Sequence, residues 1–259
     1  MQKIIEQISS WIKEKVDVAG CKGVVIGLSG GIDSAVVAAL CRKSMNKDSV
    51  LGVIMPCGSQ KEDEEDAYLV ANHLDMRTDF YDLGNAFEGL SPTSLLHYDE
   101  NMQLPNANLK ARLRMTTLYL FANTFSYLVV GTGNKTEILV GYFTKYGDGG
   151  SDIEPIGGLY KTQVFEMARV LGLPEKIINK TPSAGLWKGQ SDEEEMGVTY
   201  DELDKILKLT EGNLHQGESI DYKELCKMGK VSVEKYLKVQ KMILNSQHKR
   251  RMPLIYGIE

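Results

Sequence analysis

The clearest chemical signal in the chain lies between two apolar segments. Residues 29–34 read Ser-Gly-Gly-Ile-Asp-Ser. The apolar run over 23–28 predicts a buried strand, and the run over 35–41 predicts a core-facing helix, with Asp33 and Ser34 as its cap residues. A glycine turn between a strand and a helix N-terminus presents free backbone N–H groups and the positive end of the helix dipole. The sequence therefore predicts that residues 29–34, the phosphate loop, bind an anion.

The phosphate loop lacks the lysine of a Walker A loop. No Gly-Lys-Ser/Thr follows the glycines, and Asp33 takes the place of that lysine. A carboxylate at this point can carry a magnesium ion to bound phosphates. The alternative is an ordinary glycine-rich turn between a strand and a helix, which the complete six-residue string makes less favourable.

An alternation of strands and helices is expected to position this loop. The strands are predicted over 23–28, 50–55, 78–82 and 127–131, and the helices between them over 32–45, 62–74 and 106–124. This pattern indicates a parallel sheet with right-handed crossovers. Ligands of such sheets bind beyond the carboxyl ends of the strands, where strand order reverses. We therefore expect the site at the turns that follow the first and last of these strands.

The rest of the chain is predicted to be helices and long loops. The helices are expected over 2–17, 159–171, 201–209, 221–228 and 232–247, and the loops over 91–105, 140–158 and 180–198. Two acidic runs, 61–66 and 191–195, carry much of the negative charge. We expect both to be solvated helix starts or loops.

Composition and charge are those of an ordinary globular protein. The chain has 259 residues, 42% of them hydrophobic, and a net charge of −5. A nucleic-acid-binding surface would be basic, and no apolar stretch approaches the ~20 residues that span a bilayer. We therefore expect no nucleic-acid or membrane partner. Four scattered cysteines without metal-binding spacing indicate reduced thiols and a cytoplasmic location.

The phosphate loop resembles the pyrophosphate loop of the ATP pyrophosphatases, which adenylate a substrate and release pyrophosphate. Four further segments are similar to the NAD synthetase family: 108–115, 131–137, 141–150 and 248–251. The resemblance implies one α/β domain over 1–259, like that of adenine nucleotide hydrolases. Its sheet would be doubly wound, mostly parallel and five-stranded, with helices on both faces and a helical C-terminal segment.

The resemblance also implies a reaction. Deamido-NAD would be converted to NAD with ATP and ammonia through an adenylated carboxylate, with Mg²⁺ as cofactor, on a homodimer. The apolar circumference of the helix over 109–122 needs cover on more than one face, which fits a dimer. Only 28 residues precede Ser29. We therefore expect no glutaminase domain and the use of free ammonia.

The family motifs assign roles to individual residues. Asp33 and Glu137 would hold magnesium, and Asp148 and Lys161 would be catalytic. The implied ATP contacts are Gly27, Leu28, Ser29, Gly30, Gly31, Ile32, Asp33, Ser34, Thr132, Lys161 and Ser183, and the implied deamido-NAD contacts are Arg112, Lys145, Asp152, His248 and Lys249. Arg114 points about 200° away from Arg112 on a helix, and the family pattern selects Arg112 for the substrate.

Plainer interpretations of these residues stay open at this point. Glu137 and Lys161 are also consistent with solvated side chains, Asp148 and Asp152 with turn formers, and the basic run 248–251 with a solvated tail. The run between Thr132 and Glu137 departs from relatives that have Asp-His-Ala-Ala there, which we expect to leave the chemistry unchanged. The competing functions are another ATP pyrophosphatase, such as a GMP synthetase subunit, and an adenine-nucleotide sensor without chemistry.

Overall fold

The computed structural model describes residues 1–90, 102–183, 185, 189–216 and 221–256. The centre of the fold is a four-stranded parallel sheet. Its strands are β1 (Gly23–Gly27), β2 (Val50–Ile54), β3 (Arg77–Phe80) and β4 (Tyr127–Val130), in the order β3-β2-β1-β4. Val24 of β1 lies opposite Val50 on one side and Leu128 on the other. Strand order thus reverses at β1, as predicted.

The prediction of a fifth strand is wrong for the residues that the structure describes. The place beside β4 is taken by a single parallel bridge between Val130 and Ile153. The N–H of Gly131 donates to the carbonyl of Ile153, at 2.8 Å, and then the ladder stops. Pro155 has no N–H to donate, and the N–H of Gly157 turns back to the carbonyl of Glu154. This segment therefore follows the sheet edge for about three residues without forming a strand.

Helices cover both faces of the sheet because side chains alternate along each strand. Val24 and Ile26 of β1 pack into one apolar cluster, and Val25 packs into another on the opposite face. The first cluster lies under α1 (Gln2–Val18), α2 (Ile32–Ser44), α3 (Lys61–His73), α7 (Lys161–Val170) and α8 (Glu175–Ile178). The second lies under α4 (Gly84–Leu90) and α5 (Gln103–Phe125).

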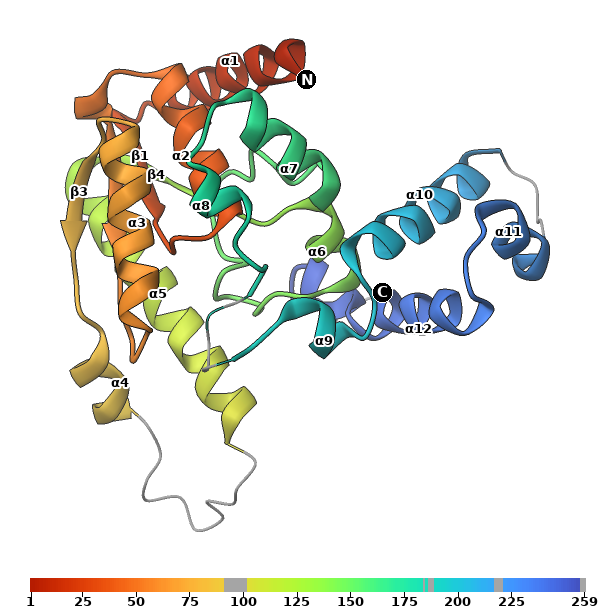
Figure 1. Cartoon of the computed structure of the whole chain (residues 1–259). Coiled ribbons are helices and arrows are strands. Elements are labelled where there is room, and N and C mark those ends of the chain that lie inside the picture. The colour runs from red at the N-terminus through yellow and green to blue at the C-terminus, as the bar shows by residue number, and fades with distance from the viewer. Residues whose placement is uncertain (91–101, 184, 186–188, 217–220, 257–259) are drawn as a thin grey trace.

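The C-terminal part of the chain forms a separate helical layer, as expected. A third apolar cluster joins Val140, Met196, Leu203 and Val239. These residues come from α6 (Lys135–Val140), α9 (Asp192–Met196), α10 (Tyr200–Gln216) and α12 (Val233–Asn245). Figure 1 shows α10, α12 and α11 (Tyr222–Gly229) to one side of the sheet layers, with α6 between the two parts.

The remaining differences from the predicted elements are local. The helix expected from residue 106 begins at Gln103, with Pro105 in its first turn, where proline is tolerated. Most of the predicted loop over 91–105 lies outside the described residues. The short helices α4, α8 and α9 were not predicted, and neither were the 3₁₀ turns η1 (Lys47–Ser49) and η2 (Gln247–Arg250). Among the described residues, no helix is long and apolar enough to cross a membrane.

Candidate functional site

The phosphate loop connects β1 to α2 and is held by its own hydroxyl groups. The Oγ of Ser34 donates to the carbonyl of Gly31 at 3.0 Å and lies 3.0 Å from the Oγ of Ser29. Gly30 has φ +74, and a Cβ on it would lie 2.5 Å from the carbonyl oxygen of Asp63. Only glycine fits there. The loop is therefore preorganised at the N-terminus of α2, where backbone N–H groups favour an anion.

A second turn, between β4 and α6, brings two carboxylates together. Asn134 is fully buried and caps α6: its Oδ1 accepts from the N–H of Glu137 at 3.0 Å. Its Nδ2 donates to the Oδ1 of Asp33 at 3.0 Å. One amide side chain thus links acidic residues that follow different strands. Sequence reasoning missed this role, although the N-cap position of Asn134, three residues before a glutamate, is a recognisable signal.

Lys161 lies between these carboxylates. Its side chain is 2% exposed, and its Nζ is 2.5 Å from Asp33 Oδ2 and 3.0 Å from Glu137 Oε1. Burial alone would lower the pKa of Lys161, but the two carboxylates outweigh burial and raise it. Burial raises the pKa of Glu137 to about 7, against the opposing charge of Lys161. The surface-lysine interpretation of Lys161 and the solvated interpretation of Glu137 are both excluded.

The donor set around Lys161 fits a magnesium ion. Oxygens of Asp33 and Glu137 converge on one cationic atom, so the same oxygens can face a metal cation. Mg²⁺ prefers hard oxygen ligands and is usually held by one or two carboxylates together with substrate phosphates and water. Among the described residues, no group of three or more His, Cys, Asp or Glu side chains could hold a metal. Two carboxylates beside a phosphate loop therefore suit a metal that arrives with a nucleotide.

A cavity of about 890 Å³ opens over the phosphate loop and this carboxylate pair. Most of the predicted site residues line it, and they come from segments far apart in the sequence. They are Gly27, Leu28, Ser29, Gly31, Ile32, Asp33, Ser34, Thr132, Glu137, Asp148, Lys161, Ser183 and Lys249. Gly30 faces α3 instead. One connected space therefore contains the predicted ATP, metal and catalytic residues.

Four predicted substrate contacts lie outside the lining of this cavity. The Nζ of Lys145 donates to the carbonyls of His248 and Arg251, at 2.6 and 3.0 Å. Arg112 donates to the carbonyl of Lys145 at 3.4 Å. These contacts join Arg112, Lys145 and His248 into a cluster of their own. The fourth residue, Asp152, accepts from the hydroxyl of Tyr119 at 3.0 Å and from the N–H of Val129 at 2.8 Å, and so ties α5 to β4.

Arg114, for which we expected a structural ion pair or a contact at the rim of the site, lines the cavity, whereas Arg112 does not. Arg114 donates to the carbonyl of Met55 at 3.1 Å and to the Oγ of Ser59 at 3.3 Å. Burial lowers the pKa of Arg114, and the charges of Asp148 and Asp63 act in the opposite direction. The two arginines point to different sides of α5, as their spacing requires. The substrate role of Arg112 stays a prediction.

The loop over 141–154 carries two carboxylates into the cavity. Asp148 Oδ1 accepts from the N–H of Thr144 at 2.9 Å. Burial raises the pKa of Asp148. The hydrogen bonds from Thr144 and the positive charge of Lys249 act to lower it, but burial outweighs them. Glu154 accepts from the N–H of Gly133 at 3.0 Å, and burial raises its pKa to about 7. Sequence reasoning missed Glu154.

The basic run near the C-terminus, residues 248–251, is hydrogen-bonded to other parts of the chain and is not a solvated tail. The Nζ of Lys249 donates to the carbonyls of Gly141 and Phe143, at 2.8 and 2.7 Å. Arg250 donates to carbonyls at the end of α6 and α12. Burial lowers the pKa of Lys249. The run therefore fastens the C-terminal segment to the loop that carries Asp148.

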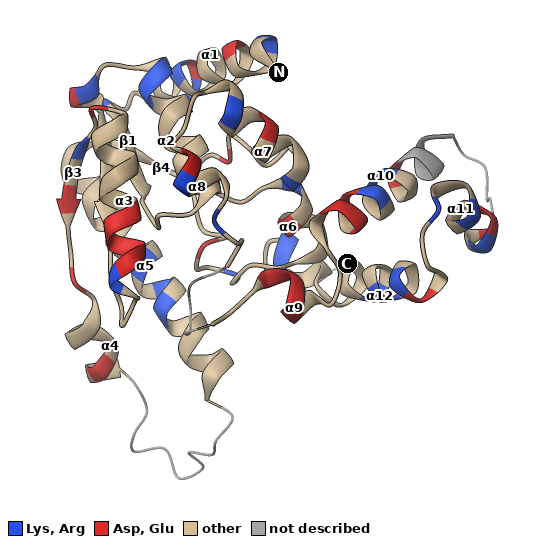
Figure 2. Ribbon diagram, viewed as in Figure 1, with Lys and Arg blue, Asp and Glu red and all other residues tan. Residues whose placement is uncertain are grey.

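Both acidic runs are less solvated than predicted. Figure 2 shows acidic residues at the start of α3 and on α9. Within them, Asp66 is fully buried and forms ion pairs with Lys176 and Lys180, both at 2.6 Å. Asp192 is 4% exposed and accepts from the hydroxyls of Tyr142 and Tyr200. Each buried carboxylate is compensated by a partner distant in the sequence, which a local pattern cannot reveal.

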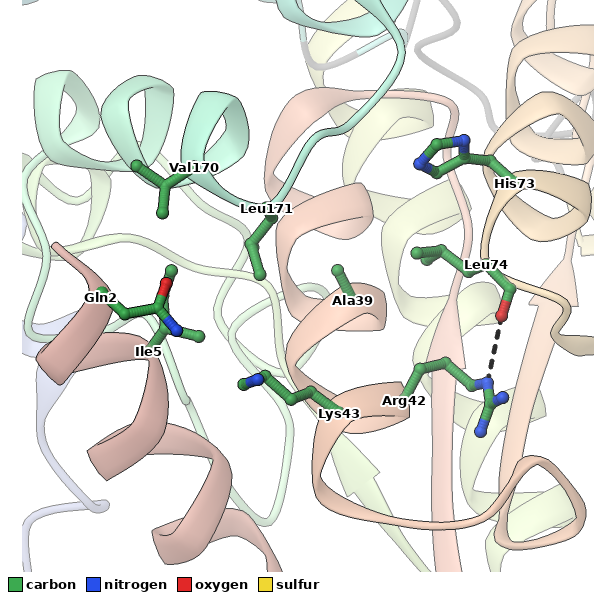
Figure 3. Close-up of a pocket in the computed structure, with 9 residues that line it drawn as sticks. All are labelled: Gln2, Ile5, Ala39, Arg42, Lys43, His73, Leu74, Val170 and Leu171. Atoms are coloured by element: carbon green, nitrogen blue, oxygen red, sulfur yellow. Dashed lines mark hydrogen bonds between the residues drawn. The ribbon is translucent and has the colours of Figure 1, made fainter.

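A second hollow, of about 530 Å³, lies away from this site. Figure 3 shows its lining: Gln2, Ile5, Ala39, Arg42, Lys43, His73, Leu74, Val170 and Leu171. The hollow adjoins the C-terminal end of α2, whereas the phosphate loop is at the N-terminal end of that helix. Arg42 is engaged with the carbonyl of Leu74. None of the predicted site residues lines it, so the cavity over the phosphate loop is the candidate active site.

The chain is similar to several known proteins. The family model described as NAD synthase matches residues 4–253. A curated NH₃-dependent NAD⁺ synthetase from Carboxydothermus hydrogenoformans is 48% identical over 251 residues, which is 96% of this chain and 94% of that protein. Two solved structures are also similar. The NMN synthetase from Francisella tularensis has a TM-score of 0.83 and 34% identity over 99% of this chain and 98% of its own. The NH₃-dependent NAD synthetase from Campylobacter jejuni has a TM-score of 0.79 and 30% identity over 99% of both chains.

Proposed function

Because the chain belongs to the NAD synthase family, we propose that it amidates deamido-NAD to NAD with ammonia, and that ATP is converted to AMP and pyrophosphate. This is the last step of NAD biosynthesis, catalysed by a ligase that forms a carbon–nitrogen bond. One observation carries the proposal. A preorganised phosphate loop, the Asp33–Lys161–Glu137 group and Asp148 share one cavity.

The first step is adenylation of the substrate. A carboxylate oxygen of deamido-NAD attacks the α-phosphorus of ATP, and the bond from that phosphorus to pyrophosphate breaks. Negative charge grows on the leaving group, so cationic stabilisation and positioning dominate catalysis. Residues 29–34 bind the β- and γ-phosphates, Lys161 contributes a buried positive charge, and Thr132 and Ser183 contact ATP. Asp33 and Glu137 would hold Mg²⁺, which when bound neutralises charge on the phosphates.

The second step forms the amide. Ammonia attacks the carboxyl carbon of the adenylate, the carbon–oxygen bond to AMP breaks, and one proton leaves the nitrogen. Asp148 is suited to hold ammonium and to accept its proton. Because burial raises its pKa, Asp148 takes up a proton more readily than an ordinary aspartate. Asp148, which this loop carries into the cavity, also favours a cation such as ammonium over an anion when it is ionised.

The finer assignments are part of the same proposal. The residues that contact deamido-NAD are Arg112, Lys145, Asp152, His248 and Lys249. The basic residues among them attract the negative phosphates of the substrate. The chain is a single domain, which the match over residues 4–253 supports, and a homodimer. The dimer is supported by exposed apolar side chains on α5, Leu104 at 60% and Leu120 at 57%. A cytoplasmic location is supported by four free cysteines.

A second candidate acceptor follows from the similarity to an NMN synthetase. Here the deamido form of the mononucleotide would replace the dinucleotide, with the same two steps. Curated relatives at 48% identity are named for NAD⁺ and favour the dinucleotide.

One assay tests the proposal and separates the acceptors. The enzyme is incubated with ATP, Mg²⁺, ammonium and either acceptor, and the products are separated. We expect NAD, AMP and pyrophosphate from deamido-NAD, with a higher kcat/KM than for the mononucleotide. Release of ADP and phosphate would remove the adenylation mechanism, and a reversed preference would reassign the substrate.

A further inference from the structure

Two carboxylates lie directly behind the phosphate loop. A Cβ on Gly30 would lie 2.5 Å from the carbonyl oxygen of Asp63 and 2.8 Å from the Cβ of Asp66, so this side of the loop packs on the first turns of α3. The loop is where the phosphates of ATP are proposed to bind. The negative charges of Asp63 and Asp66, so close to the loop, would oppose the binding of phosphates if no positive charge compensated them.

Two lysines, one turn apart on the chain after α7, compensate this charge. The Nζ of Lys180 lies 2.9 Å from Asp63 Oδ1 and 2.6 Å from Asp66 Oδ2. The Nζ of Lys176 lies 2.6 Å from Asp66 Oδ1. Burial alone would lower the pKa of Lys180, but the carboxylates of Asp66 and Asp63 outweigh it and raise the pKa. Lys180 therefore carries a full positive charge at neutral pH.

The two lysines differ in what else they face. Lys180 lines the cavity, its side chain is 27% exposed, and its Nζ is 3.5 Å from the carbonyl oxygen of Gly30. Lys176 is 51% exposed and does not line the cavity. An ammonium group has three N–H donors. At Lys180 two donate to Asp63 and Asp66, and the third makes only a long hydrogen bond, 3.5 Å, to the carbonyl of Gly30. A phosphate at the loop can replace that carbonyl as the acceptor of the third N–H.

We propose that Lys180 is a phosphate-binding residue of this enzyme, which donates to the terminal phosphates of ATP and then to the departing pyrophosphate. It would act with Lys161 as a second cation at the phosphate loop, while Asp63 and Asp66 hold its side chain in position. This inference rests on the proposed function. It adds a residue that the sequence motifs did not identify.

Direct binding of magnesium pyrophosphate to Lys180→Met, Lys176→Met and wild type tests the proposal by calorimetry. A hydrogen bond between charged partners at a phosphate predicts a rise in Kd of roughly tenfold to a hundredfold for Lys180→Met. Lys176 pairs with Asp66, as Lys180 does, but does not line the cavity. The Kd of Lys176→Met should therefore stay within about threefold of the wild-type Kd. Equal Kd values for Lys180→Met and wild type would overturn the proposal. Equal losses in both variants would reduce Lys180 to a structural ion-pair partner.

A double variant separates contact from charge balance. Lys180→Met leaves Asp63 without its lysine, so Asp63→Asn in the same chain restores the net charge behind the loop. If Lys180 touches phosphate, pyrophosphate binding stays weak in the double variant; recovery to the wild-type Kd would show that Lys180 only neutralises Asp63. Melting temperatures report whether each variant folds. Production of NAD by wild type is measured in parallel, so a failure of the proposed function is visible independently of these Kd values.

Discussion

The residues proposed to bind ATP, the ATP side, and those proposed to bind deamido-NAD, the acceptor side, differ in how completely the free chain assembles them. On the ATP side, Asp33, Asn134, Glu137 and Lys161 come from three segments and are joined by hydrogen bonds and ion pairs of 2.5–3.0 Å. On the acceptor side, Arg112, Lys145 and His248 meet mainly through backbone carbonyls outside the cavity. The difference indicates that the residues proposed for ATP are preorganised, whereas those proposed for deamido-NAD are not joined to one another through their side chains.

The largest effect should follow loss of the buried cation. Lys161→Met leaves Asp33 and Glu137 facing each other in a site that excludes most water, so kcat should fall roughly 10³-fold. The melting temperature should also fall, and Mg²⁺ should raise it more than in wild type by replacing the lost charge. Lys235→Met, which breaks an exposed pair with Glu202, is the control. Near-normal turnover in Lys161→Met would contradict a preorganised ATP side.

A second large fall in turnover should follow when either proposed metal ligand, Asp33 or Glu137, is changed on its own. Asp33→Asn and Glu137→Gln each remove one negative oxygen ligand but keep the shape, so turnover should fall roughly 10²-fold or more, with a weaker response to Mg²⁺. The measurement is the rate as a function of free Mg²⁺. A variant with normal turnover at limiting Mg²⁺ would lose its assigned metal role.

More of the residues predicted for the ATP side than for the acceptor side meet at the cavity, for physical reasons. The phosphate loop is contiguous, and Asp33 and Glu137 follow strands whose adjacency the alternation predicts. Burial of Asp66 was not predictable, because it depends on Lys180, 114 residues away. The place of Arg114 depends on how α5 is rotated against β1, which spacing alone does not determine. That the described residues contain no fifth strand depends on Pro155 and the turn after it.

A moderate effect tests the acceptor side. Arg112→Ala should raise the KM for deamido-NAD about tenfold, because one hydrogen bond between charged groups is lost. The KM for ATP should stay unchanged. Arg114→Ala is the matched variant, because it lies two residues away and lines the cavity. If only Arg114→Ala raises the KM for deamido-NAD, the substrate contact belongs to Arg114.

The smallest effect is a pH dependence of stability. The pKa of Glu154 is raised by burial from 4.5 to about 7, so the folded state prefers its neutral form. Its contribution to stability is fully present below pH 4.5 and is lost as pH rises to about 7. Glu154→Gln removes that loss. Its melting temperature relative to wild type should therefore rise by a few degrees between pH 5 and pH 8. A constant difference across this range would contradict the burial of a titrating carboxyl.

The central claim is that the preorganised ATP side transfers AMP to the acceptor carboxylate, and an oxygen label tests it most directly. Deamido-NAD with both carboxylate oxygens replaced by ¹⁸O is converted with ATP, Mg²⁺ and ammonium, and the products are analysed by mass spectrometry. Adenylation predicts one ¹⁸O in AMP, one retained in the amide of NAD, and none in pyrophosphate. Appearance of the label in inorganic phosphate, or unlabelled AMP, would contradict the account.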